Sequence, residues 1–234
     1  MIQKIIKLLW PEICPFCGDV YRNGICPACE SKLNLLRITQ PRCMKCGKPV
    51  RRHEQEYCRD CEGKKHHFDS GRALWLHKPP VSQSIYQFKY HNQREFGKYY
   101  AREMVRQYSG LIREWNPDFI IPIPLHKRRR RKRGFNQSQI MADEIGKLMD
   151  IPVDATVLKR VRYTNPQKIL DPLSRQKNLH NAFKVEGNVN YMHTVIIIDD
   201  IYTTGNTLDE AAKTLKNAGV QNVFFLTVSI GQGY

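Results

Sequence analysis

The sequence predicts an α/β domain with a parallel sheet flanked by helices, preceded by a small zinc-ribbon-like domain at the N-terminus. After residue 67, apolar runs alternate with amphipathic segments, which is typical of a parallel sheet covered on both faces. All eight cysteines lie between Cys14 and Cys61. We therefore expect a zinc-binding domain over residues 1–66 and an α/β domain over residues 67–234.

The elements of the larger domain follow from its periodicity. Continuous apolar runs bounded by polar residues predict buried strands, and apolar residues three or four positions apart predict helices. In chain order the expected elements are a strand at 72–77, helices at 81–89 and 94–108, a strand at 119–125, a helix at 137–149, a strand at 193–199, a helix at 207–217 and a strand at 223–229.

The composition is that of a folded, basic chain. It carries 38 Lys and Arg against 22 Asp and Glu, a formal net charge of +16, and 41% of its residues are hydrophobic. This charge favours polyanionic partners such as nucleic acid, nucleotides or phosphorylated sugars. The alternative is that the charge serves solubility alone.

The first eleven residues contain an apolar stretch that is too short to span a membrane and is interrupted by Lys4 and Lys7. No small-residue cleavage site follows it, so we do not read a secretory signal. Its apolar residues have helical spacing, which predicts a helix docked on the body of the protein and not a membrane anchor: Ile2, Ile5, Ile6 and Leu9. We expect a cytoplasmic protein.

The cysteines form four C-x-x-C pairs, and zinc favours such turns because each one presents two thiolates to a single ion. A repeat groups them, since each C-x-x-C followed by Gly is succeeded by a C-x-x-C followed by Glu. We expect two structural zinc ions, one in a first cysteine unit and one in a second: Cys14, Cys17, Cys26 and Cys29, then Cys43, Cys46, Cys58 and Cys61. Crossed pairing, in which the first turn joins the third, remains the alternative.

Other roles for the cysteines fit less well. Disulfides are disfavoured because no secretory signal is present. A redox-active C-x-x-C requires a strand-to-helix context in an α/β domain, which these loops lack. A zinc module of this kind can bind nucleic acid, bind a protein or cap the larger domain, and the sequence does not choose among these roles.

The segment from His193 to Asn217 carries the clearest functional pattern, namely an apolar strand, two carboxylates, a T-T-G-N-T loop and a helix. Backbone N–H groups and hydroxyls just before a helix N-terminus favour a phosphate. Asp199 and Asp200, at the carboxyl end of the strand, can accept hydrogen bonds from ribose hydroxyls and hold magnesium through water. The alternative is an ordinary βα turn in which the aspartates cap nearby amides.

A second strand, at 119–125, is followed by seven consecutive cations, Lys127 to Arg133. We expect a basic loop here, with Asn136 as the N-cap of the next helix. The run carries more charge than one pyrophosphate requires, so it is either a solvated loop or a surface that follows a nucleic-acid backbone.

The 193–217 segment resembles the fingerprint of type I phosphoribosyltransferases, which bind phosphoribosyl pyrophosphate (PRPP) with magnesium. The resemblance implies that Asp199 and Asp200 grip the ribose, that Lys127 and Arg128 meet the pyrophosphate, and that the 5′-phosphate is cradled by Thr203, Thr204, Gly205, Asn206 and Thr207. It also implies a mobile loop after residue 158 that closes over the site through Arg160, Gln167, Arg175 and Asn178. Alternatively, these four residues only hold that loop against the surface.

Taken together, the motifs are similar to those of the ComF family of competence-associated proteins. They are the paired cysteines, I-P-x-P-L with R-G-F-N-Q, T-x-x-Q…R-x-x-N-L…A-F and D-D-x-x-T-T-G-x-T, in family order from Cys14 to Ser229. The resemblance implies a cytoplasmic role in natural transformation, in which the protein handles incoming single-stranded DNA beside a helicase-like partner. The cation run is denser here than we expect for that family.

Two functions remain open at this level. The protein is either a transferase that joins PRPP to a nitrogenous acceptor, or a binding module for which PRPP is a ligand and DNA the working partner. Aromatic residues near the cations could stack on unpaired bases, although their spacing is more typical of core residues: Tyr86, Phe88, Tyr90 and Phe135. We expect a PRPP-binding protein that acts in DNA uptake.

Overall fold

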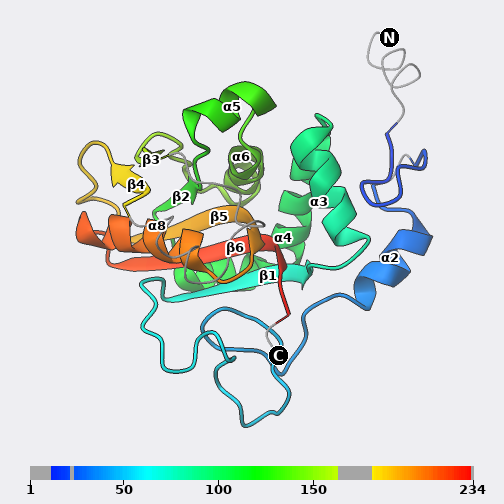
Figure 1. The fold of residues 1–234 in the computed structure, drawn as a ribbon, viewed down its shortest axis with the longest axis horizontal. Coiled ribbons are helices and arrows are strands. Elements are labelled where there is room, and N and C mark those ends of the chain that lie inside the picture. Colours follow the sequence, from blue (N-terminus) through cyan, green and yellow to red (C-terminus); the bar gives the residue numbers. More distant parts are fainter. Residues whose placement is uncertain (1–11, 22–23, 163–180, 233–234) are drawn as a thin grey trace.

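The computed structural model describes residues 12–21, 24–162 and 181–232 (Figure 1). The helix expected within residues 1–11 and the loop residues Gln167, Arg175 and Asn178 lie outside these ranges. Within them, no helix combines the length and apolarity needed to cross a membrane.

The centre of the molecule is a parallel sheet in the order β1-β6-β5-β2. Its strands begin within two residues of the predicted apolar runs: β1 (Ser70–Leu76), β2 (Phe119–Pro122), β5 (Thr194–Tyr202) and β6 (Asn222–Ile230). β2 ends at Pro122, three residues before its predicted end. β5 continues past the predicted end because it pairs with β6 as far as Tyr202, opposite Ile230. The two aspartates therefore lie within the last part of a central strand.

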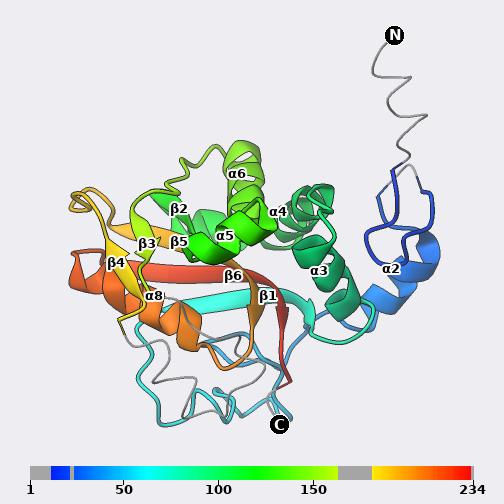
Figure 2. The same ribbon diagram turned by 45° about the horizontal axis from the view of Figure 1, so that its top comes forward.

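Helices cover both faces of this sheet (Figure 2). One face carries α3 (Val81–Tyr90), α4 (Glu95–Trp115) and α6 (Gln137–Met149), and the other carries α8 (Asn206–Asn217). Alternate residues of β5 serve the two layers, because successive side chains of a strand point to opposite faces. Ile196 and Ile198 pack with α3, α4 and α6, whereas Val195 and Ile197 pack with α8.

The cysteine units pack on opposite faces of the sheet. The first unit, with helix α2 (Pro27–Asn34), joins the apolar cluster that contains Trp75 and Tyr100. The second unit joins the cluster beside α8, where its four buried cysteines lie among Phe68 and Tyr202. The amino-terminal part of the chain therefore contributes to the core of the α/β body on both sides.

The seven cations form a short helix, α5 (Lys127–Arg133), where we expected a loop. Lys and Arg are good helix formers, and cations near a helix C-terminus interact favourably with its dipole. His126 caps the start of α5, since its Nδ1 accepts the Arg128 N–H at 3.3 Å, and Gly134 ends the helix with a φ of 80°. The run lacks apolar residues, so no amphipathic periodicity revealed this helix.

Two further expectations are corrected by the local hydrogen bonds. Asn136 occupies the N-cap position of α6, but its side chain does not cap the helix and donates instead to the Ile123 carbonyl at 3.1 Å. Arg160 does not lie in a loop. It is the last residue of β3 (Leu158–Arg160), which pairs antiparallel with β4 (Phe183–Val185).

Helix α4 offers a matched pair of glycines for testing this packing. A methyl group at Gly97 would lie 2.8 Å from both Ile140 and Phe88, whereas one at Gly110 would have no neighbour within 4 Å. We expect Gly97→Ala to destabilise the protein by about 1–3 kcal/mol through overpacking. Gly110→Ala should stabilise it by up to about 1 kcal/mol through helix propensity. Urea unfolding of the two variants measures this, and a destabilising Gly110→Ala together with a neutral Gly97→Ala would contradict the packing.

Candidate functional site

The two aspartates of β5, the acid pair, meet a lysine from a distant helix. Asp200 accepts a hydrogen bond from Lys89 Nζ at 2.7 Å, and both side chains are largely buried, at 12% and 17% exposure. Lys89 lies in the last turn of α3, far from the acid pair in sequence, so no local pattern predicted this contact. The lysine neutralises part of the charge that the acid pair brings into the protein.

Asp199 accepts two hydrogen bonds. Its Oδ1 accepts the backbone N–H of Asp200 at 2.9 Å and the hydroxyl of Ser138 at 3.2 Å. Burial, and then the charge of Asp200, raise the pKa of Asp199 to about 7, despite the opposing influence of Lys89. Two adjacent carboxylates with one ammonium make a site suited to a further cation or to hydroxyl donors.

The 203–207 loop follows directly and leads into α8. Gly205 has a φ of 79°, and a Cβ built there would overlap the Tyr202 hydroxyl oxygen, so only glycine fits. The N-cap residue of α8 is Gly205, which has no side chain to accept the first N–H groups of the helix. Thr204 Oγ1 is buried and has no hydrogen-bond partner among the described residues. These features fit an anionic group bound at the loop.

The basic helix α5 presents two kinds of cation. Lys127 and Arg128, which sequence reasoning selected for pyrophosphate, are exposed. Arg129 and Arg133, four residues apart on one face of α5, are partly buried, and the charge of Asp200 acts on Arg133. The Arg133 guanidinium also donates to Gln137 Oε1 at 2.5 Å and lies 5.1 Å from the ring centroid of Tyr90. Because the run forms a helix, the four-residue spacing of Arg129 and Arg133 places both on the partly buried face of α5.

Arg160 extends the basic surroundings of the acid pair. Its guanidinium lies 5.5 Å from the ring centroid of Phe183, and the charges of Arg129 and Asp199 act on it. Burial, followed by the nearby charge of Arg129, lowers the pKa of Arg160 to about 10. Of the four residues predicted for the mobile loop, Arg160 is thus close to the acid pair, and the other three lie outside the described residues.

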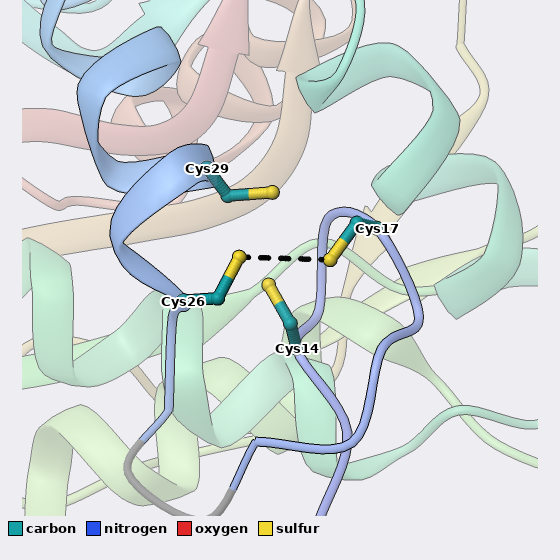
Figure 3. A group of neighbouring side chains, drawn as sticks. All are labelled: Cys14, Cys17, Cys26 and Cys29. Carbon is teal, nitrogen blue, oxygen red and sulfur yellow. Dashed lines mark hydrogen bonds between the residues drawn. The ribbon is translucent and has the colours of Figure 1, made fainter.

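The sulfurs of each cysteine unit converge on one point. In the first unit, two cysteines come from a turn and two from the start of α2 (Figure 3), and the sulfurs of Cys17 and Cys26 are 3.7 Å apart. In the second unit, the sulfurs of Cys46 and Cys58 are 3.5 Å apart. Within each unit all four sulfurs lie within 4.8 Å of one another. Pairing within each repeat is confirmed, and the crossed alternative is wrong.

Such sulfur groups suit zinc. Tetrahedral zinc holds thiolates at about 2.3 Å, which separates neighbouring sulfurs by roughly the distances seen here. All eight cysteines lie within the described ranges, and none of them forms a disulfide. Two four-cysteine sites therefore fit two structural zinc ions.

Comparison with protein families assigns both parts of the chain. Residues 5–62 match the double zinc ribbon domain, and residues 97–230 match the phosphoribosyl transferase domain. Among solved structures, a purine phosphoribosyltransferase from Pyrococcus horikoshii is 18% identical and covers 56% of this chain and 74% of its own, with a TM-score of 0.38.

Similar proteins extend over most of the chain. Competence protein F of Haemophilus influenzae is 30% identical, over 87% of this chain and 89% of its own length. DNA utilization protein YhgH of Shigella flexneri is 32% identical, over 86% and 87%. Competence protein ComFC of Bacillus subtilis is 28% identical, over 83% and 79%. With its double zinc ribbon and its phosphoribosyl transferase domain, the chain belongs to the ComF family.

Proposed function

We propose that this protein binds PRPP with magnesium at the acid pair and the 203–207 loop, and that it acts on incoming DNA in the cytoplasm. One observation carries the first part of the proposal. The acid pair, the Thr204 hydroxyl, which has no hydrogen-bond partner among the described residues, and the start of α8 follow one another within residues 199–206, at the carboxyl end of β5. Ligands of α/β sheets bind outside this edge.

Each group has a distinct task in this proposal. The 203–207 loop holds the 5′-phosphate through backbone N–H groups and hydroxyls. Asp199 and Asp200 accept hydrogen bonds from the ribose hydroxyls. The hydrogen bond from Lys89 to Asp200 breaks when the ligand binds. Magnesium, when bound, neutralises the negative charge of the pyrophosphate. Asp200 acts on Arg133 and Asp199 acts on Arg160, and Arg129 is close enough to both arginines to act on them. In the proposal these three arginines contact the pyrophosphate more directly than the exposed Lys127 and Arg128.

Transfer to a nitrogenous acceptor is the alternative to binding alone. In that reaction the bond between ribose C1 and pyrophosphate breaks, and an acceptor nitrogen forms the new bond to C1. The transition state resembles an oxocarbenium ion, so positioning and charge stabilisation suffice without a general base. Release of pyrophosphate in the presence of both PRPP and an acceptor would favour this alternative.

We also propose that single-stranded DNA binds beside the same site. The rings of Tyr86 and Tyr90 are half or more exposed and 4.9 Å apart, and Arg133 of the basic helix lies over Tyr90. Exposed rings beside cations suit unpaired bases and their phosphates. Phe88 and Phe135, by contrast, are buried, as core spacing suggested. The names competence protein and DNA utilization protein, given to relatives, favour a role with DNA. We also propose a helicase-like partner in this role.

Calorimetry with PRPP and magnesium tests the site. We expect Asp200→Asn to weaken binding about tenfold to a hundredfold, because the ligand then forms a neutral hydrogen bond in place of a charge-assisted one. Asp143→Asn, an exposed change of the same charge on α6, is the matched control and should bind like the parent. Equal affinity in all three proteins would place PRPP elsewhere, and no binding by the folded parent would remove PRPP from the proposal.

The raised pKa of Asp199 predicts a pH dependence. The folded protein holds this proton up to about pH 7, whereas the unfolded chain releases it near the ordinary value of 3.8. Stability from this group is therefore greatest below the unfolded pKa and falls as the pH rises through the folded pKa. We expect the parent to lose more stability than Asp199→Asn over this interval in urea unfolding. Parallel curves for the two proteins would show that folding does not raise the pKa of Asp199.

The salt dependence of single-stranded DNA binding tests the basic helix. Replacing the outer cations Lys127, Arg128, Arg130, Arg131 and Lys132 by Gln should reduce the slope of log K against log salt by about 0.7 for each phosphate that α5 no longer neutralises. A control carries five neutral replacements on the second cysteine unit and its following segment, at Arg51, Arg52, Arg59, Lys64 and Lys65. If both variants change the slope equally, net charge and not α5 governs binding.

A further inference from the structure

Each end of the 203–207 loop is followed or preceded by a residue that contacts the second cysteine unit or the segment just after that unit. Tyr202 precedes the loop, and Asp209 follows it in the first turn of α8. The residues that they contact, between Lys48 and Phe68, belong to the second cysteine unit and to the segment that leaves it. These contacts connect parts of the chain that are more than a hundred positions apart.

Tyr202 supports the loop from beneath. It is 1% exposed, and its ring stacks on Phe225 with centroids 5.2 Å apart and planes at 14°. Lys48 Nζ lies 5.6 Å above the same ring, and Phe68 packs edge-on at 6.3 Å. The phenol hydroxyl lies so close to Gly205 that it leaves no room for a Cβ there. The middle of the loop therefore rests on a ring whose position the cysteine unit helps to fix.

Asp209 anchors the other end of the loop. Its Oδ1 accepts the backbone N–H of His67 at 2.6 Å, and its Oδ2 lies 3.2 Å from His67 Nδ1. His66 Nδ1 lies 3.4 Å from Oδ1. Burial alone would raise the pKa of Asp209, but the close contact with His66 and the hydrogen bonds with His67 outweigh it and hold this pKa below its usual value. The His66 ring also stacks on Phe68 at 4.7 Å, so Phe68 joins the two anchors.

The second cysteine unit is itself fixed to the sheet. Lys48 forms an ion pair with Asp60, which links the two C-x-x-C turns of the unit. The backbone N–H of Gly71, in β1, donates to the Lys45 carbonyl at 2.9 Å. Zinc bound by the four thiolates would cross-link the same turns. A well-ordered second unit therefore restricts the positions of Tyr202 and Asp209 through the contacts described above.

We propose that the second cysteine unit positions the 203–207 loop for phosphate, with Tyr202 and Asp209 as the positioning residues. This inference rests on the proposed function of that loop. The first cysteine unit packs on the opposite face of the sheet, in the cluster of Trp75 and Tyr100. The first unit serves as an internal comparison, because it has the same four cysteine ligands as the second unit but does not lie beneath the loop.

The test compares two neighbouring carboxylates of α8. Asp209→Asn removes the charge and one acceptor from the histidine contacts, whereas Glu210→Gln makes the same chemical change at a residue that accepts the Asn181 N–H instead. Hydrogen exchange of residues 203–209 is measured without ligand, together with PRPP affinity and bound zinc. Asp209→Asn should speed this exchange and weaken PRPP binding, each about tenfold, with zinc content unchanged. Glu210→Gln should change neither quantity.

A second measurement uses the reciprocity of coupled sites. With the first unit disabled by Cys17→Ser, PRPP should slow the transfer of the remaining zinc to a chelator, because a ligand that orders the loop also orders the unit beneath it. With the second unit disabled by Cys58→Ser, PRPP should leave zinc transfer from the first unit unchanged.

The outcomes separate this inference from the function on which it rests. Equal exchange of residues 203–209 in the two carboxylate variants would overturn the positioning role, whatever the affinity for PRPP. Faster exchange in Asp209→Asn alone would support that role even if the parent bound no PRPP, and in that case the proposed function would fail by itself.

Discussion

The parallel pairing of β5 with both β6 and β2 determines where every candidate functional group lies. It places β5 in the interior of the sheet, so the strand must be apolar along most of its length. Only at its carboxyl end do Asp199 and Asp200 interrupt the apolar run, and there the chain turns into the loop that begins α8. Polar groups brought so close to the core must find partners or be kept for a ligand.

The acid pair illustrates that constraint. Two adjacent carboxylates in a buried position repel each other, and the protein offsets the cost with one lysine, one hydroxyl and one backbone N–H. Lys89 donates a hydrogen bond to Asp200, at the position that a cation or hydroxyl donor of the proposed ligand would take. These partners stabilise the acid pair, and the remaining negative charge suits the magnesium or hydroxyl donor that we propose it receives. Functional sites commonly retain such perturbed groups.

The cysteine units give the fold a second kind of constraint. Neither forms a separate core, because each contributes its buried cysteines to an apolar cluster of the sheet. Composition marks a change near residue 66, yet the rings of His66 and Phe68 stack across that position. The second unit consequently reaches the base of the 203–207 loop, so its zinc site lies next to the loop that we propose binds phosphate.

The sequence was informative wherever periodicity was strong. Helix α6 and the strands β1, β5 and β6 were predicted closely because alternating or continuous apolar residues define them. Helix α5 was missed because seven consecutive cations have no apolar stripe, although their helix propensity and the caps His126 and Gly134 were local signals. Lys89 was missed for a different reason. Its partner, Asp200, lies more than a hundred residues away, and only the fold brings them together.

The most direct test of the central claim is a crystal structure of the protein with PRPP and magnesium. We predict that the 5′-phosphate lies on the N–H groups of the 203–207 loop, that the ribose hydroxyls contact the acid pair, and that Lys89 has left Asp200. A structure in which PRPP occupies another surface while the bond between Lys89 and Asp200 stays intact would contradict the account.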